Sequence, residues 1–106
     1  MKSIIVSMFA AAGLMVAGGA MAVDMPAVAK KNFCTSCHAI DKKVLGPAWQ
    51  AVADKYKGDA SAHDKLSAKI AKGGSGVWGS MAMPAQPKVN EADMKELVGF
   101  ILGLAK

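Results

Sequence analysis

Residues 34–38 read Cys-Thr-Ser-Cys-His, and the interpretation of the whole sequence starts from this stretch. The two thiols stand three positions apart, so they can lie on one side of a helical turn, and His38 follows directly. C-x-x-C-H is the attachment signature of c-type haem, in which two thioether bonds fix one edge of the porphyrin. The same spacing carries the His38 imidazole under the ring, where it can bind iron. The motif therefore predicts one covalent haem c attached at Cys34 and Cys37.

Two other interpretations of the motif stay open from these residues alone. A thiol–disulfide redox pair has the same C-x-x-C spacing, but such pairs accompany βαβ patterns, and no strand pattern stands out here. A zinc site would need further ligands, for which only His63 and scattered acidic residues are available. A helical pattern and an export signal, both described below, favour haem attachment.

The N-terminal segment has the order of a secretory signal peptide. Lys2 precedes an apolar run over residues 4–17, and Ala20-Met21-Ala22 is a small-x-small cleavage site. We expect residues 1–22 to be cleaved in the periplasm, leaving one domain over residues 23–106. An uncleaved membrane anchor is the alternative, because this uncharged segment is long enough to span a bilayer.

A domain of this size buries only a modest core, and small exported domains usually add disulfides or another staple. The sequence has only two cysteines, and a bridge between them would close a tiny loop that adds little stability. A haem is a large apolar object that could complete the core. We therefore expect the chain to fold poorly without it. The net charge of +5 comes from scattered lysines and is typical of a solvated surface, and export argues against a nucleic-acid partner.

Apolar spacing and capping residues predict an all-α fold of about four helices. Their expected ranges are residues 24–33, 47–58, 61–72 and 90–102. The last is the clearest, because Asn90 can cap it and its apolar residues recur at helical spacing. Gly99 within it predicts either a close helix crossing or tolerated flexibility. Trp49 and Tyr56 are expected in the core.

The segment over residues 73–89 is too long and too apolar to be a simple connection. It supplies Met81 and Met83 as candidates for the second axial position of iron, and the ligand there decides the chemistry. Met83 precedes Pro84, which fixes the chain direction. We expect Met81 to point elsewhere and to serve packing. His63 lies in a charged helical stretch and is expected at the surface.

Three stretches resemble the small bacterial class I cytochromes c of the c-551/c-552 group. They are residues 34–38, Leu-Gly-Pro-Ala-Trp at 45–49, and Gly-Val-Trp-Gly-Ser-Met-Ala-Met-Pro at 76–84. Their order and spacing agree across essentially all of residues 23–106. The resemblance implies a few α-helices packed around one covalent haem whose iron has histidine and methionine as axial ligands.

The same resemblance implies roles for single residues. It places the axial sulfur on Met83, so that His38 and Met83 are the metal ligands. It places the Pro47 carbonyl beside His38, as acceptor of the imidazole N–H. It also places Trp78 near a haem propionate. Pro47 and Trp78 would then belong to the environment of the cofactor.

The function implied by this family is one-electron transfer in the periplasm and not enzyme catalysis. The implied partners are a respiratory donor and a terminal reductase, oxidase or peroxidase, met in transient complexes. We expect no nucleic acid, no stable membrane insertion and a monomer. Four lysines indicate either a solvated face or the docking surface, namely Lys42, Lys43, Lys55 and Lys57.

Two rival functions are weighed against this one. A haem enzyme or gas-binding protein would need an open sixth position with a distal acid or base, for which only His63 is left. A domain cut from a larger multi-haem enzyme is disfavoured by the short chain with its own signal peptide.

Overall fold

The computed structural model describes residues 23–106, so the predicted signal peptide and its cleavage site lie outside the described residues. Over this range the chain forms the helices α2 (Ala27–Lys31), α3 (Trp49–Lys55), α4 (Ala62–Lys72) and α5 (Glu91–Leu102), with a 3₁₀ turn η2 (Cys34–Ser36). A hairpin of strands β1 (Gly74–Gly76) and β2 (Gly79–Met83) lies between α4 and α5 in sequence. None of the described helices has both the length and the apolar character required to cross a bilayer.

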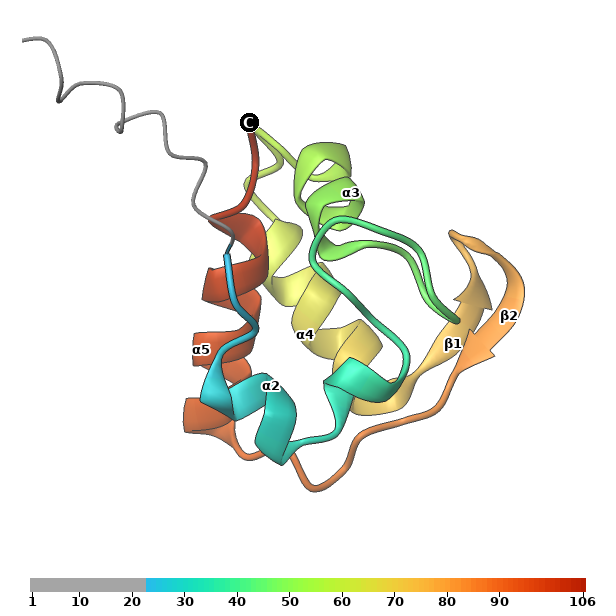
Figure 1. Ribbon diagram of the computed structural model, residues 1–106, viewed down its shortest axis with the longest axis vertical. Helices are drawn as coiled ribbons and strands as arrows, with labels where there is room; N and C mark the ends of the chain where they lie inside the picture. The colour runs from blue at the N-terminus through green and yellow to red at the C-terminus, as the bar shows by residue number, and fades with distance from the viewer. Residues whose placement is uncertain (1–22) are drawn as a thin grey trace, which may run out of the picture.

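Helix α5 is the element around which the others pack. It contacts α2, α3 and α4, while the hairpin lies at the opposite edge of the molecule (Figure 1). The predicted cap is confirmed, because the Asn90 side chain accepts a hydrogen bond of 2.8 Å from the backbone N–H of Asp93. A Cβ built on Gly99 would meet no atom within 4 Å, so of the two explanations left open for this glycine the close helix crossing is wrong.

The core confirms the predicted helical faces. Its buried members are Val28, Ala29, Trp49, Val52, Leu66, Ile70, Leu97, Val98 and Ile101. Trp49 is 4% exposed, and Tyr56 packs against the cluster from a half-buried position. The apolar residues of four short segments thus meet in one cluster, which is small for a domain of this length.

The expected ranges of the first two helices, residues 24–33 and 47–58, were too long at both ends, because α2 ends at Lys31 and α3 at Lys55. Helix α2 begins only after Pro26, which is its N-cap, and Asp24 does not cap it. Helix α3 begins at Trp49, two residues after Pro47. Ala48 is its N-cap and has an extended backbone, and the carbonyl oxygen of Pro47 accepts a hydrogen bond from His38. The later start of α3 matters for function, because Pro47 then lies in the loop that contacts His38.

The hairpin contradicts the expectation that residues 73–89 contain no strand. The strands are antiparallel, with Gly74 paired to Met83 and Gly76 to Gly79. Gly73 ends α4 with a φ of 72°, and a Cβ there would collide with the backbone of Met83, Pro84 and Ala85. Alternation of apolar and polar residues gave no strand signal, because the strands are exposed and rich in glycine. The fold is therefore mostly helical, with one hairpin.

Candidate functional site

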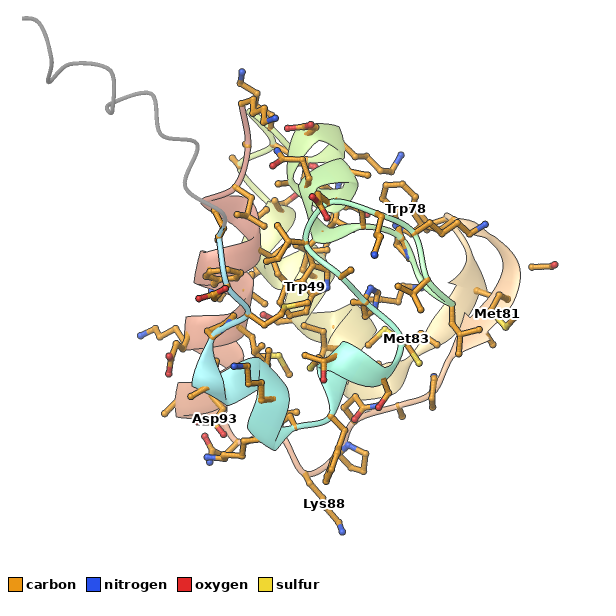
Figure 2. The ribbon with its side chains drawn as sticks, viewed as in Figure 1. Trp49, Trp78, Met81, Met83, Lys88 and Asp93 are labelled. Atoms are coloured by element: carbon orange, nitrogen blue, oxygen red, sulfur yellow. The ribbon has the colours of Figure 1, made fainter. Side chains whose placement is uncertain are left out.

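A cavity of about 480 Å³ opens among the motif, the loop before α3, the helices and the hairpin. Cys34, Cys37 and His38 line it together with the hairpin residues Met81 and Met83. Its remaining lining from the helices is mostly apolar, and it includes Trp49, Val52, Leu66, Ile70, Leu97 and Ile101. Figure 2 shows Met83 pointing into the interior of the molecule, while Met81 lies at its outer edge.

The imidazole of His38 is oriented by two neighbours. Its Nδ1 lies 2.8 Å from the carbonyl oxygen of Pro47. A carbonyl oxygen can only accept, so Nδ1 is the donor and Nε2 is left as the nitrogen free to bind a metal. The ring centroid lies 5.7 Å from that of Trp49.

The loop that carries His38 is tied to the start of α3. The backbone N–H of Trp49 donates to Ala39 at 3.0 Å, and that of Gln50 donates to Ile40 at 2.8 Å. The loop therefore has a fixed register against α3, so the orientation of His38 is built into the backbone.

Gly46 leaves room for the His38 ring. A Cβ on Gly46 would lie 2.6 Å from Cε1 and 3.0 Å from Nδ1 of His38. Real Cβ atoms do not approach so closely, so any other residue would displace the imidazole. Sequence reasoning placed Gly46 in a family stretch but missed this contact, because closeness between a backbone and a ring leaves no periodic signal.

We predict that Gly46→Ala destabilises the holoprotein by about 1–3 kcal/mol, because the added methyl overpacks the ring of His38. Denaturant unfolding followed by circular dichroism measures the effect. Gly99→Ala is the matched control, since its methyl enters open space on a helix and should stabilise by up to about 1 kcal/mol. Equal stability of Gly46→Ala and the unmodified protein would show that the ring has room to move.

The two thiols are half-buried and unbridged. Burial raises the pKa of Cys34, and the neighbouring charge of Cys37 adds to the increase, against a backbone hydrogen bond that lowers it. Redox-active C-x-x-C pairs have thiols with lowered pKa values. The raised pKa of Cys34 thus disfavours the thiol–disulfide interpretation.

The zinc interpretation lacks ligands. Within residues 23–106, no three His, Cys, Asp or Glu side chains gather where they could hold a metal ion. His63, the remaining histidine, is exposed on α4 and contacts Ser67 instead of lining the cavity. A structural zinc site needs four ligands.

The expectation that Met81 points away from the site is wrong. Met81 and Met83 are two positions apart in β2, and alternate residues of a strand share a face, so both line the cavity. They differ in burial instead. Met81 is 65% exposed, whereas Met83 is half-buried and packs against the hydrophobic core.

The other predicted residues also meet at this cavity. Pro47 lines it next to His38, and Trp78 lines it from the turn between the strands, with 40% of its surface exposed. The site thus gathers every residue that the sequence singled out for the cofactor, whatever the separation in sequence.

Phe33 and Lys69 are among the lining residues that were not predicted. Phe33 precedes the motif with a φ of 62° and is 77% exposed. Left-handed backbone is rare for a bulky residue, and here it turns the chain from α2 into η2. Lys69 lies on the inner side of α4, one residue before buried Ile70, and only its position on that helical face could have indicated it.

The chemistry of these residues fits a covalently attached haem. Two adjacent half-buried thiols can form thioethers, and the imidazole nitrogen and a thioether sulfur are both soft enough for haem iron. The mostly apolar cavity suits a flat, largely apolar macrocycle.

Comparisons with known proteins agree with this fit. The family model described as cytochrome c matches residues 23–105. Cytochrome c-552 of Nitrosomonas europaea is 45% identical over 105 residues, covering 98% of this chain and 99% of the relative. Cytochrome c-551 of Allochromatium vinosum is 49% identical over 77 residues, covering 73% of this chain and 82% of the relative. The crystal structure of wild-type Nitrosomonas europaea cytochrome c552 superimposes with a TM-score of 0.70 at 45% identity, covering 73% of this chain and 95% of that one.

Proposed function

Because this chain belongs to the cytochrome c family, in the c-551/c-552 group of class I, we propose that it is a periplasmic carrier that passes single electrons to a terminal reductase or oxidase. It is a monohaem electron-transfer protein, not an enzyme, and its cofactor is covalent haem c. The observation that carries the proposal is the single cavity, in which both thiols, the oriented imidazole and a half-buried thioether meet.

The residues divide into attachment, ligation and surroundings. Cys34 and Cys37 would form the thioether bonds, and His38 Nε2 and the sulfur of Met83 would be the axial ligands. The hydrogen bond from His38 Nδ1 to Pro47 supports this assignment, because it leaves Nε2 free. The assignment of Met83 over Met81 is supported by its deeper burial.

When bound, haem c supplies an iron that gains and loses one electron at a potential set by its ligands and surroundings. Met83 favours the reduced state, because a thioether is a soft, neutral ligand. Pro47 fixes the orientation of His38, so the imidazole needs little rearrangement. Leu97 and Ile101 keep water from the apolar wall, which disfavours the extra charge of the oxidised state. Trp78, at the cavity mouth, would lie near a propionate.

Location and partners belong to the same proposal. Residues 1–22 would direct export and be removed. The partners would be a respiratory donor and a reductase, oxidase or peroxidase, bound in small transient complexes. Without Lys2 the exported chain has twelve lysines and eight acidic residues, and this net charge of +4 would mainly affect the encounter rate and its salt dependence. This function involves neither nucleic acid nor stable insertion into a membrane. A monomer that diffuses between its partners would suit it.

The reduced holoprotein should not bind carbon monoxide at neutral pH, because Met83 occupies the sixth position. Optical spectroscopy under carbon monoxide measures this binding. In a separate experiment, the exported protein should be recovered from the periplasmic fraction with Val23 as its first residue. Rapid formation of a carbon monoxide complex would favour the gas-binding or peroxidase alternative. A membrane-bound chain that retains residues 1–22 would contradict the location.

A further inference from the structure

The hairpin that carries Met83 is attached to the helices at its base and is exposed beyond it. The backbone N–H of Gln86 donates to Ile70 of α4 at 2.9 Å, and Gly73 packs against the chain just after Met83. Apart from Met83, all residues of β1 and β2 are exposed. Such a hairpin can pivot on its base unless its far end is also held.

A lysine of α3 contacts the far end of the hairpin. Lys55, the last residue of α3, places its Nζ 5.8 Å from the ring centroid of Trp78 and 5.9 Å from that of Tyr56. Both distances lie within the range of a cation–π interaction. In Figure 2, Trp78 lies on the side of the hairpin that faces α3.

The ammonium of Lys55 has no competing ion pair in the part of the chain that the structure describes. The ion pairs there are Lys31–Asp93 and Lys65–Asp59. Of the four lysines that were expected on a solvated face or docking surface, Lys57 contacts the main-chain oxygen of the C-terminal residue, and Lys42 and Lys43 have no ion-pair or ring partner in the described residues. Lys55 is the exception, because it faces two rings.

We propose that Lys55 is a positioning residue for the axial sulfur: by sharing its charge between Tyr56 and Trp78, it ties the turn of the hairpin to α3 and holds Met83 at the iron. The inference rests on the proposed ligation by Met83. We call the three residues Lys55, Tyr56 and Trp78 the clasp.

The clasp gives α3 a role at both axial positions. The start of α3 fixes His38, through the bonds from Trp49 and Gln50 to the preceding loop. The end of α3 holds the hairpin through Lys55. The tip is the part of the hairpin farthest from the base on which it would pivot. A contact there opposes this motion most effectively, so even a weak interaction would slow the departure of Met83.

Ligand exchange in the oxidised holoprotein tests the clasp. At saturating imidazole, the first-order rate at which the near-infrared thioether–iron band disappears reports how fast Met83 leaves. Lys55→Gln should raise this rate roughly two- to five-fold, the size of an exposed cation–π interaction. Lys55→Arg should restore the original rate, because a guanidinium also stacks on aromatic rings.

Lys72→Gln is the control for charge, because Lys72 is an exposed lysine beside the base of the hairpin with no ring partner. It should leave the rate unchanged. The clasp is overturned if Lys55→Gln exchanges at the original rate, if Lys72→Gln accelerates exchange equally, or if Lys55→Arg is as fast as Lys55→Gln. If the unsubstituted protein lacks the band, the ligation by Met83 fails and the clasp fails with it. A normal band with an unchanged Lys55→Gln rate overturns the clasp alone.

Discussion

Replacing Met83 by alanine is expected to lower the reduction potential by on the order of 100 mV or more, within the wide range that axial ligands set in haem proteins. The change removes a soft ligand that favours the reduced state and admits water or an added ligand to the iron. The near-infrared thioether band of the oxidised protein should disappear. Electron transfer to the natural partner should fail, and peroxidase-like side activity should increase. Potentiometric titration measures the reduction potential, and the spectrum of the oxidised protein shows whether the thioether band is lost.

Met81→Ala is the matched control for this substitution. Both methionines line the cavity from the same face of β2, but Met81 is 65% exposed and Met83 packs against the core. Met81→Ala should keep the band and shift the potential only slightly, through packing. Loss of the band in Met81→Ala together with its retention in Met83→Ala would reverse the assignment. Retention in both variants would show that neither Met81 nor Met83 is by itself the required ligand, and absence of the band from the unsubstituted protein would favour the ligand-binding alternative.

The second large effect is expected from removing both attachment points. Cys34→Ala combined with Cys37→Ala should give little stable protein, because covalent attachment is what holds the cofactor in an otherwise small core. The cavity of about 480 Å³ borders core residues such as Leu97 and Ile101, so its contents contribute to the packing of α5. Scanning calorimetry of the purified variant measures the loss.

The single variant Cys34→Ala provides an internal comparison, because one thioether and His38 can still retain the cofactor. Its yield and unfolding temperature should lie between those of the holoprotein and those of the double variant. A cooperative thermal transition in the haem-free double variant, at the temperature of the holoprotein, would show that residues 23–106 fold without help from the cofactor.

Much of the fold follows from local signals in the sequence. Helix α5 combines an asparagine cap, acidic residues in its first turn and apolar residues at helical spacing, and all of these agree. Helix α4 lies almost where the glycine stop at residue 73 predicts it. Such elements are predictable because each signal acts over a few neighbouring residues.

The hairpin was not predictable in the same way. Its residues are exposed apart from half-buried Met83, so burial imposes no alternation on the strands, and glycine gives no strand propensity. The wrong expectation for Met81 has the same origin. Once the segment is a strand, residues two apart share a face, and only their distance from the core separates Met83 from Met81.

The residues of the site were predictable in kind, whereas their contacts were not. The C-x-x-C-H motif names Cys34, Cys37 and His38 because thioether chemistry demands that spacing. The room that Gly46 leaves for an imidazole, and the rings around Lys55, depend on segments that meet only in three dimensions. No local sequence pattern indicates contacts of this kind.

The intact mass of the exported protein, measured under denaturing conditions, is the most direct test of whether one haem is covalently attached through Cys34 and Cys37. We predict the mass of residues 23–106 plus one haem, with absorbing haem that acid–acetone does not extract and no thiol free to alkylate. An extractable haem, or a chain of unmodified mass with two free thiols, would contradict the account.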